Sequence, residues 1–351
     1  MFVLYNLSGG GAERVAVNYL RQLDTSKYAS TLIVLEFLGD LLHLVPASTN
    51  VIELKMKKKY RLLIPLLIIL KNNKPDVVFT THSFIPFLLF CIKPYMKKYF
   101  HIARMPNMPT LEKKYLSYGK IIHLMYFIGY RSADIVVAQT EDMKKDAMKI
   151  YSLPETKTVV LHNPIDVYYI NSMLTNKISP FGEGKKNIVA SGRLAYQKAF
   201  DVLIHSIKDV SCVYPNLVLS IFGRDHGEGK KLKELVKELG INDHVQFCGF
   251  VENPYLYYQF SDLFVLSSRY EGFPNVILEN YYLNTPIVST NCIPMIEKLI
   301  NQGENGYICN VDDPKSMADA ILKALNLSRK KIKNPPYFGG CLASLINNIP
   351  K

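Results

Sequence analysis

The chain has 351 residues, of which 48% are hydrophobic and 21% are charged. This length allows two domains of ordinary size, and this composition excludes an intrinsically disordered protein. Six scattered cysteines, none in a C-x-x-C pair, argue against a zinc site or a disulfide framework and are typical of a reducing cytoplasm. Because the chain runs from Met1 straight into an expected strand, we expect no signal peptide.

The net charge of +12 is concentrated in the first half of the chain. Residues 1–165 carry 22 Lys and Arg against 12 Asp and Glu, whereas residues 166–351 carry 20 against 18. Two apolar runs, Leu62–Leu70 and Phe84–Phe90, lie among these basic residues and are about half as long as a transmembrane helix. A basic and apolar domain indicates a surface that rests on an anionic membrane, and buried helices with solvated lysines are the alternative. Because no nucleic-acid-binding motif accompanies the charge, we expect no nucleic acid partner.

Short strands rich in β-branched residues alternate with helices in the first half. We expect strands at Phe2–Tyr5, Ser30–Leu35, Asp76–Thr80 and Ile135–Ala138, and a helix from about Ala12 to Leu23. Such apolar strands, separated by helices, predict a parallel sheet covered on both faces. Between the first strand and the first helix, Gly9-Gly10-Gly11 lets the backbone approach a ligand closely, although the sequence does not complete a G-x-G-x-x-G pattern.

The same pattern restarts after a strand at Thr158–Leu161, and we place the domain boundary near residues 165–185. The second half predicts strands at Asn187–Ala190, Leu217–Phe222, Val245–Phe247, Leu263–Leu266 and Ile287–Ser289, with helices at Asp201–Val210, Lys230–Leu239 and Asp312–Leu327. Two doubly wound domains that face each other leave a cleft at the carboxyl ends of both sheets, where ligands bind. Asn334–Cys341, with two prolines and two glycines, ends the regular pattern.

Two glutamates stand eight positions apart at Glu271 and Glu279. Gly272 and Pro274 break any helix at the front of this segment, and Val276–Asn284 reads as a helix that Asn275 is able to cap. The backbone N–H groups and the dipole at such a helix start favour a phosphate. Carboxylates on either side accept hydrogen bonds from hydroxyl groups, so the segment predicts a site for a sugar, a phosphate and a ribose.

Glu271-Gly-Phe-Pro-Asn-Val-Ile-Leu-Glu279 resembles the E-x7-E signature of retaining GT-B glycosyltransferases of family 4 (group 1), a family with many lipopolysaccharide and capsule enzymes. Further likeness to this family lies in Leu7–Arg14, Ala133–Ala138, His162–Asp166, Ser191–Arg193 with Lys198, Gly249–Val251 and Ser267–Glu271. In this order the motifs are specific to the family, though not to one sugar. The resemblance implies an α/β fold of the GT-B type, with two Rossmann-like doubly wound domains facing a central cleft.

The resemblance assigns the acceptor to the domain at residues 1–165 and the nucleotide sugar to the domain at residues 166–351. It also implies that the last 25 or so residues (327–351) return to the first domain, although the segment that would do so is short.

The resemblance further implies a catalytic set. Arg193 and Lys198 would stabilise the departing diphosphate in place of a metal ion, so we expect no metal and no other cofactor. Glu271 would position the transferred sugar, and Glu279 would accept hydrogen bonds from the ribose. The remaining donor contacts are expected from Gly10, Gly11, Phe250, Val251, Phe273, Pro274 and Asn275.

The first domain departs from the family pattern at Arg104-Met-Pro-Asn107, where Pro106 occupies the place of a family histidine. Front-face retaining transfer does not need that histidine, because the departing phosphate can take the acceptor proton. Arg104 and Asn107 are therefore candidates for orienting the acceptor. His82, which follows an expected strand, is a third candidate, although a lone histidine is more often structural.

We therefore expect a retaining hexosyltransferase that moves a hexose or N-acetylhexosamine from a UDP-sugar to a lipid-linked glycan, lipopolysaccharide or capsule acceptor. GDP remains open as the donor nucleotide. The enzyme is expected in the cytoplasm, peripheral on the inner face of the cytoplasmic membrane. One alternative is a sugar-nucleotide 2-epimerase of the same fold, which would interconvert free nucleotide sugars without an added acceptor. The other is a degenerate, non-catalytic sugar-nucleotide-binding protein, which the intact Glu271, Glu279, Arg193 and Lys198 argue against.

Overall fold

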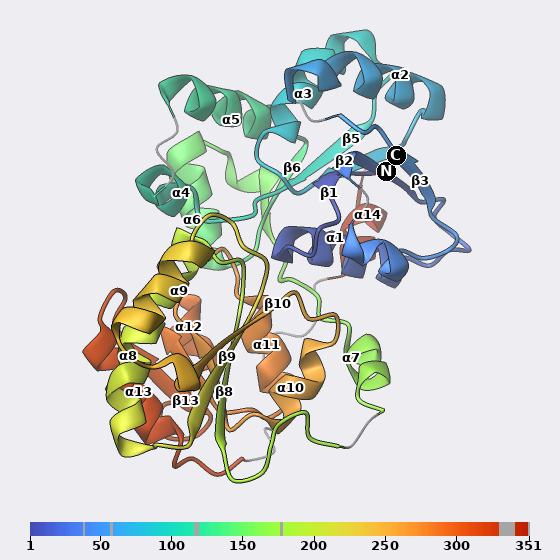
Figure 1. Cartoon of the computed structure of the whole chain (residues 1–351). Coiled ribbons are helices and arrows are strands. Elements are labelled where there is room, and N and C mark those ends of the chain that lie inside the picture. Colours follow the sequence, from blue (N-terminus) through green and yellow to red (C-terminus); the bar gives the residue numbers. More distant parts are fainter. Residues whose placement is uncertain (38, 57–58, 116–118, 176–177, 330–340, 350–351) are drawn as a thin grey trace. The chain divides into compact units, whose positions relative to one another are not determined.

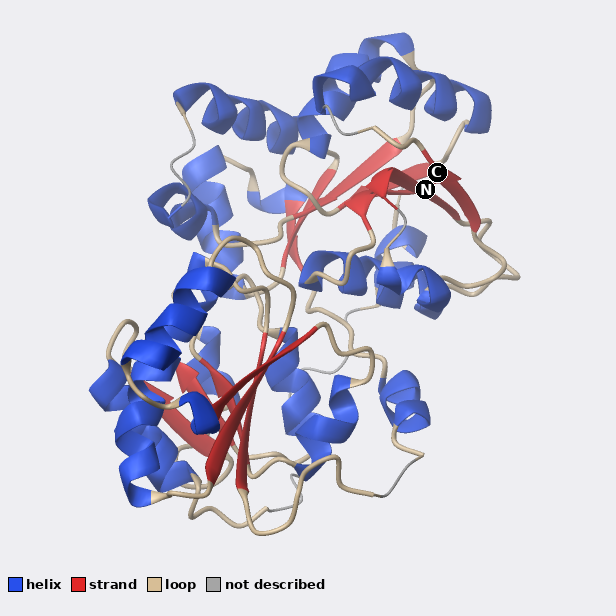
Figure 2. Ribbon diagram, in the orientation of Figure 1, coloured by secondary structure: helices blue, strands red, loops and turns tan. Residues whose placement is uncertain are grey.

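The computed structural model describes residues 1–37, 39–56, 59–115, 119–175, 178–329 and 341–349 (Figure 1). The chain divides into two compact units. The N-terminal unit comprises the described residues of Met1–Ile165 and of Phe338–Lys351, and the C-terminal unit comprises those of Asp166–Tyr337. Each unit is built around one parallel sheet with helices against it (Figure 2).

The N-terminal sheet has seven strands in the order β3-β2-β1-β4-β5-β6-β7. Their bounds are β1 Phe2–Asn6, β2 Thr31–Phe37, β3 Asn50–Glu53, β4 Val77–Thr80, β5 Phe100–Arg104, β6 Ile135–Ala138 and β7 Thr158–Val160. The order runs outward from β1 in one direction and continues from β4 in the other. The neighbours β1 and β4 therefore form the switch point of this sheet, where ligands bind in open α/β folds.

The sequence did not lead us to expect β3 or β5. Both strands carry polar residues where a buried run would be apolar, because β3 lies at the sheet edge and β5 places His101 and Arg104 in the interior. β5 nevertheless pairs with β4 and β6 along its length.

Helices cover both faces of the N-terminal sheet (Figure 1). On one face lie α2 (Leu63–Asn73), α3 (Ile85–Ile92) and α5 (Lys120–Ser132), and on the other lie α1 (Gly11–Gln22) and α14 (Leu342–Asn347). The unit also contains α4 (Pro109–Tyr115), α6 (Glu141–Tyr151) and the 3-10 turns η1 (Asp40–Leu44), η2 (Lys59–Leu62), η3 (Lys93–Tyr95) and η4 (Glu155–Lys157). Leu66 and Leu70 of α2 are fully buried in one core with Val3 and Ile33 of the sheet.

The last described residues pack on the N-terminal unit. α14 contacts α1, and its first residue, Leu342, is only 1% exposed. Tyr28 donates a hydrogen bond to the side-chain oxygen of Asn347 near the end of α14. Of the segment Asn334–Cys341, residues 334–340 lie outside the described residues.

The C-terminal sheet has six parallel strands in the order β10-β9-β8-β11-β12-β13. Their bounds are β8 Lys186–Ser191, β9 Leu217–Phe222, β10 Val245–Gly249, β11 Leu263–Leu266, β12 Ile287–Thr290 and β13 Gly306–Cys309. β13, an edge strand with half-buried residues, is a further strand that the sequence did not lead us to expect. The switch point lies between the neighbours β8 and β11.

The helices of the C-terminal unit also form two layers (Figure 1). α8 (Phe200–Val213), α9 (Gly229–Glu238) and α13 (Pro314–Ala324) share one core with the sheet. On the opposite face lie α10 (Pro254–Phe260) and α11 (Asn275–Tyr282). The remaining elements are α7 (Val167–Met173), α12 (Met295–Leu299) and the 3-10 turns η5 (Tyr196–Lys198) and η6 (Asn242–His244). None of the described helices combines the length and the apolar composition that a bilayer crossing requires.

The start of α11 corrects one prediction. Asn275 is the first residue of the helix and does not cap it, and Pro274 holds the cap position without a side-chain hydrogen bond. The N–H of Asn275 instead bonds the carbonyl of Phe273 at 3.0 Å, which tightens the turn before the helix. Since Pro274 has no N–H, the start of α11 presents one backbone donor fewer to a ligand.

Candidate active site

Two loops meet at the switch point of the C-terminal sheet. One follows β8 and contains the turn Tyr196–Lys198, and the other follows β11 and contains Ser267–Phe273. β8 and β11 are parallel and hydrogen-bonded to each other, so both loops leave the same edge of the sheet. The predicted residues Lys198 and Glu271 are brought together in this way, although 73 positions separate them.

Lys198 and Glu271 form a close, shielded ion pair. The Nζ atom of Lys198 lies 2.6 Å from Oε1 of Glu271, and their side chains are 16% and 9% exposed. The hydroxyl of Ser268 donates to the same carboxylate oxygen at 2.6 Å. An ammonium group has three donors, so Lys198 can keep this contact while it binds a second anion. The pair therefore offers one cation and one carboxylate to a ligand that carries both phosphate and hydroxyl groups.

Arg269 fastens the two loops to each other. It is 7% exposed, and its guanidinium lies 2.6 Å from a carboxylate oxygen of Asp201 and 2.7 Å from one of Asp312. It also donates to the carbonyl of Tyr196 at 2.7 Å and stacks 4.1 Å from that ring. The N–H of Arg269 bonds the carbonyl of Gln197, immediately before Lys198. The position of Lys198 thus depends on a buried arginine of the neighbouring loop.

Two glycines allow β8 and β9 to end in close contact. Gly223 has φ +150°, and a Cβ added there would lie 1.7 Å from the carbonyl oxygen of Gly192. A Cβ added at Gly192 would lie 2.7 Å from Cε of Lys198. A Cβ at Gly223 would meet fixed backbone, whereas a Cβ at Gly192 would displace the stem of Lys198, which lies directly over the backbone at the strand end.

The other predicted donor residues differ in exposure. Arg193 is exposed, and its guanidinium lies 3.4 Å from the side-chain oxygen of Gln197. Phe250 is 37% exposed at the end of β10, which excludes plain core packing, and Val251 is half-buried. The guanidinium carbon of Arg224 lies 5.0 Å from the centre of the Phe250 ring. Sequence reasoning missed Arg224, because only the pairing of β9 with β10 brings it beside Phe250.

The predicted residues around the start of α11 are mostly buried. Phe273 is 6% exposed, Pro274 is buried, and Asn275 is half-buried at the first position of the helix. Glu279, in the second turn of α11, is 7% exposed, as is Glu271. A buried carboxylate requires partners, and Glu271 has them in Lys198 and Ser268.

Gly10 and Gly11 open α1 at the switch point of the N-terminal sheet. A Cβ on Gly10 would lie 2.3 Å from a carboxylate oxygen of Glu13, in the first turn of α1. His82, after β4, places Nε2 3.4 Å from the other carboxylate oxygen of Glu13, and its ring lies 4.7 Å from that of Tyr5. The Nδ1 atom of His82 is buried and has no hydrogen-bond partner within the described residues. Glu13, which sequence reasoning missed, therefore shares this switch point with His82.

Arg104 lies in the interior of the N-terminal unit. It is 2% exposed, and its guanidinium donates to the hydroxyl of Thr81 at 2.8 Å and to the side-chain oxygen of Asn163 at 2.7 Å. Burial lowers the pKa of Arg104 to about 10. These contacts tie β5 to the segments after β4 and β7, and they occupy the guanidinium.

Asn107 donates at 3.2 Å to a carboxylate oxygen of Glu112. Glu112, in α4, is 6% exposed. Burial raises the pKa of its carboxyl to about 7, and the hydrogen bond from Asn107 offsets part of that effect. Arg104 bonds Thr81, the chain neighbour of His82, whereas Asn107 bonds Glu112 of α4.

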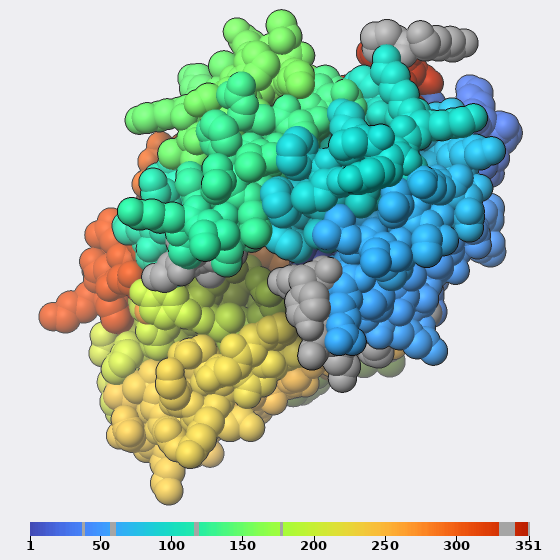
Figure 3. Space-filling view, turned by 90° about the horizontal axis from the view of Figure 1, so that it is seen from above, coloured from blue at the N-terminus to red at the C-terminus, as the bar shows by residue number. Residues whose placement is uncertain are grey.

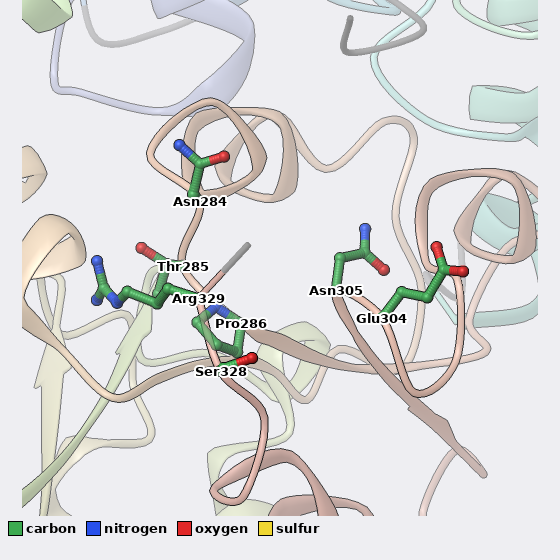
Figure 4. Close-up of a pocket in the computed structure, with 7 residues that line it drawn as sticks. All are labelled: Asn284, Thr285, Pro286, Glu304, Asn305, Ser328 and Arg329. Carbon is green, nitrogen blue, oxygen red and sulfur yellow. The ribbon is translucent and has the colours of Figure 1, made fainter. Parts of the chain in front are cut away.

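The C-terminal unit also has a shallow pocket (Figure 4). It lies at the edge of the sheet opposite the candidate site, so it is not part of that site. It is lined by Asn284, Thr285, Pro286, Glu304, Asn305, Ser328 and Arg329. Pro286 and Asn305 directly precede β12 and β13, so the pocket lies at the amino ends of these strands. Arg329 donates there to the backbone carbonyls of Gln259 and Ser261 at the end of α10. Across the described chain, His, Cys, Asp and Glu residues form no group of three that could hold a metal ion.

Two glycosyltransferase family models match most of the chain. The model described as glycosyltransferase family 4 matches residues 9–168, and the model described as glycosyl transferases group 1 matches residues 174–335.

Comparison with known proteins gives related sequences and a similar fold. An uncharacterized glycosyltransferase of Methanocaldococcus jannaschii is 34% identical over 257 residues, or 68% of this chain and 60% of that protein. The lipopolysaccharide core biosynthesis glycosyltransferase LpsE of Rhizobium meliloti is 27% identical over 278 residues, or 74% of this chain and 69% of that protein. HepE of Anabaena, solved in complex with UDP and glucose, superposes with a TM-score of 0.72 at 18% identity over 93% of this chain and 90% of that chain.

The first relatives that match this chain extend well beyond the matched region. The chain spans only about three fifths of the length of these curated proteins. The two parallel sheets, each with its own switch point, agree with the fold of the solved structure. On the matches to both family models and this fold, the chain belongs to the group 1 glycosyl transferases of the GT-B fold.

Proposed function

We propose that this chain is a retaining hexosyltransferase that uses a UDP-sugar as donor and needs no metal ion. The observation that carries the proposal is the Lys198–Glu271 pair at the switch point of the C-terminal sheet, where open α/β folds bind nucleotides. The similarity to HepE, which was solved with UDP and glucose, supports the choice of nucleotide.

In the proposed reaction, the bond between the anomeric carbon of the sugar and the diphosphate breaks. Negative charge then develops on the diphosphate oxygen, and Lys198 and Arg193 stabilise that charge. Glu271 holds a hydroxyl of the transferred sugar, and Glu279 accepts from the ribose hydroxyls. The acceptor oxygen bonds the anomeric carbon on the face that the phosphate leaves, and the departing phosphate takes the proton of that hydroxyl, so the configuration at the anomeric carbon is retained.

Gly10, Gly11, Phe250, Val251, Phe273, Pro274 and Asn275 complete the proposed donor contacts. His82, Arg104 and Asn107 remain proposed acceptor residues. Of these, His82 is the one with a buried ring nitrogen that lacks a hydrogen-bond partner within the described residues. Arg104 already bonds Thr81 and Asn163, so its proposed effect on an acceptor is indirect.

The proposed acceptor is a lipid-linked glycan, a lipopolysaccharide or a capsule precursor, at the inner face of the cytoplasmic membrane. The lipopolysaccharide core enzyme LpsE among the relatives supports an acceptor of this class. The basic N-terminal half supports an anionic membrane surface as a partner.

Calorimetric titration with UDP and with GDP in the presence of EDTA tests the nucleotide site. We expect saturable binding of UDP in EDTA, and no saturable binding of either nucleotide would overturn the proposal. Incubation with radiolabelled UDP-sugars, with and without membrane extract, then tests transfer. Label transferred to an extract component supports the transferase, whereas conversion of the free nucleotide sugar without an acceptor indicates an epimerase. NMR of the product measures whether the anomeric configuration is retained.

A further inference from the structure

The N-terminal unit gathers exposed apolar side chains on one side. Within the described residues, seven of the thirteen large hydrophobic residues that are exposed lie on α2, on α3 with the adjoining turn η3, and on α5. These seven are Ile64, Ile68, Phe90, Tyr95, Ile121, Ile122 and Leu124, and we call them the α2–α5 face. α3 packs against both α2 and α5. Figure 3 is seen from above, so the side of the unit that carries these helices is turned toward the viewer.

Packing within the unit does not account for this face. Leu66 and Leu70 of α2 point into the core and are fully buried, whereas Ile64 and Ile68 are 70% and 52% exposed. Ile64 and Ile68 are four positions apart, so they lie on one outer side of the helix. On α5, Ile121 and Leu124 are likewise 70% and 56% exposed. A surface helix normally keeps its outer side polar, and a contiguous apolar surface marks an interaction site.

The segment that carries this face is strongly basic. Residues 54–133 contain fifteen Lys and Arg but only two acidic residues, Asp76 and Glu112, so this segment carries +13 and the rest of the chain −1. Glu112 is buried, which removes it from the surface. Exposed lysines adjoin each helix of the face: Lys71 and Lys74 at the end of α2, Lys97 and Lys98 after η3, and Lys120 at the start of α5.

A matching partner must be anionic and must also accept aliphatic side chains. A bilayer that contains anionic lipids has both properties, because headgroup phosphates meet the lysines and the acyl boundary takes up isoleucine and leucine. We propose that the α2–α5 face docks the N-terminal unit on an anionic lipid bilayer. The unit then lies on the membrane through this face. This inference gives a location to the membrane contact of the proposed function and rests on that proposal to this extent.

The chain contains no tryptophan, so a single introduced tryptophan reports on its own surroundings. Ile64→Trp and Leu124→Trp place the probe on the α2–α5 face. Val213→Trp places it at a residue of the C-terminal unit that is 59% exposed and serves as the matched control. The partner is a vesicle of phosphatidylglycerol and phosphatidylcholine. A second preparation of the same vesicle carries brominated acyl chains.

We expect the emission of Ile64→Trp and of Leu124→Trp to shift to shorter wavelength with the anionic vesicles and to be quenched by the brominated lipid. The control probe should remain unchanged. Absence of a shift at both test positions, or an equal shift at Val213→Trp, would overturn the proposal.

Variants of the face test the apolar and the basic contributions separately by vesicle sedimentation. Ile64→Ser combined with Leu124→Ser should lower the bound fraction at least tenfold, whereas Tyr168→Ser with Val213→Ser, at exposed positions of the other unit, should not. Lys97→Glu with Lys98→Glu should also lower binding at least tenfold, and the loss should be largest at low salt. Binding to pure phosphatidylcholine that equals binding to the anionic vesicle would contradict the role of the lysines.

Two further measurements distinguish membrane docking from a contact between copies of the chain, and the docking face from the proposed function. If Ile64→Ser with Leu124→Ser converts a dimer into a monomer in sedimentation velocity and leaves vesicle binding unchanged, the face is a contact between copies and the lipid proposal fails. UDP titration of the wild-type chain, set beside its vesicle binding, separates this inference from the proposed function. If the chain binds vesicles but not UDP, the docking face is supported and the transferase proposal is wrong. If the chain binds UDP but not vesicles, the transferase proposal is supported and the docking face is wrong.

Discussion

Each unit brings a glutamate next to a nitrogen-bearing side chain at the switch point of its sheet, and the two pairs differ in how firmly they are held. In the C-terminal unit, Lys198 and Glu271 are 2.6 Å apart and share the hydroxyl of Ser268. In the N-terminal unit, Glu13 and His82 are 3.4 Å apart, and the second ring nitrogen of His82 has no hydrogen-bond partner within the described residues. Almost the same sequence distance separates the partners, 73 and 69 positions. Strand order creates both pairs, and the network around each pair determines what it can do.

The C-terminal pair is prepared for a fixed ligand, because its loops are tied together through Arg269. In the N-terminal pair, only the Nδ1 atom of His82 lacks a hydrogen-bond partner within the described residues, and it is the position offered to a variable partner. This difference agrees with a donor site in the C-terminal unit and an acceptor site in the N-terminal unit, as proposed above. The variants below test the two assignments against each other.

Removal of the C-terminal pair should have the largest effect. Lys198→Ala or Glu271→Ala should lower kcat/KM for transfer by about 10²- to 10³-fold, because stabilisation of the departing diphosphate or of the sugar is lost. Steady-state transfer assays measure this effect. Lys186→Ala is the matched control, since Lys186 and Asp262 form an ion pair of 3.1 Å at the opposite, amino-terminal edge of the same strands. Equal losses in Lys186→Ala and Lys198→Ala would remove the distinction between the two sheet edges.

A pH experiment compares how the two units hold a buried carboxylate. Glu271 has Lys198 beside it, whereas burial raises the pKa of Glu112 to about 7, against an ordinary value of 4.5. Below pH 4.5 Glu112 is protonated in both the folded and the unfolded chain. Between pH 4.5 and 7 only the folded chain keeps the proton, so the contribution of Glu112 to stability falls by about 3 kcal/mol as pH rises through this window.

Glu112→Gln removes this titration. Its free energy of unfolding relative to wild type should therefore rise by about 3 kcal/mol from pH 4.5 to pH 8, which urea unfolding at several pH values measures. Glu155→Gln alters a glutamate whose side chain is 77% exposed and should leave the pH dependence almost unchanged. An offset between Glu112→Gln and wild type that does not change with pH would show that Glu112 ionises normally.

Loss of the loop connection should have an intermediate effect. Arg269→Ala removes the bonds to Asp201, Asp312 and the carbonyl of Tyr196, so Lys198 should lose its fixed position and kcat/KM should fall about tenfold. Arg269→Lys keeps the charge but not the planar fork, and we expect it to restore only part of the activity. UDP titration should show the same weakening, which a change confined to stability would not cause.

Arg329→Ala is the control for Arg269→Ala. Arg329 also donates to backbone carbonyls in the C-terminal unit, but at the pocket on the amino-terminal side of the sheet (Figure 4). Arg329→Ala should lower the melting temperature, while its affinity for UDP should stay at the wild-type value. If both variants weaken UDP binding in proportion to their loss of stability, Arg269 does not position Lys198.

The sequence predicted the architecture where strands are short apolar runs, as at Leu217–Phe222, and failed where they are not. β5 was missed because His101 and Arg104 look like surface residues, yet the interior satisfies both: His101 lies 3.1 Å from the hydroxyl of Thr80, and Arg104 bonds Thr81. Burial lowers the pKa of His101 to about 3, which keeps it neutral there. Such strands can be predicted only when the hydrogen-bond partners of their polar residues are known.

The residues of the candidate site also differ in whether the sequence alone could identify them. Lys198 and Glu271 could be found because each lies in a short motif, whereas Glu13 and Arg224 could not. Glu13 becomes relevant only because β1 and β4 are neighbours, and Arg224 only because Phe250 follows the adjacent strand β10. Strand order results from packing over the whole sheet, so no local pattern contains it.

The smallest effect is expected at the N-terminal pair and gives the sharpest distinction between the units. Glu13→Gln and His82→Asn should each raise KM for the acceptor by less than about tenfold, because each removes one contact of roughly 1 kcal/mol. The affinity for UDP should stay unchanged, since the proposed nucleotide contacts of these variants are intact. Glu53→Gln, at the end of the edge strand β3 and 3.8 Å from Lys55, should change neither quantity. A loss of UDP affinity in Glu13→Gln would instead make Glu13 a donor residue beside Gly10 and Gly11.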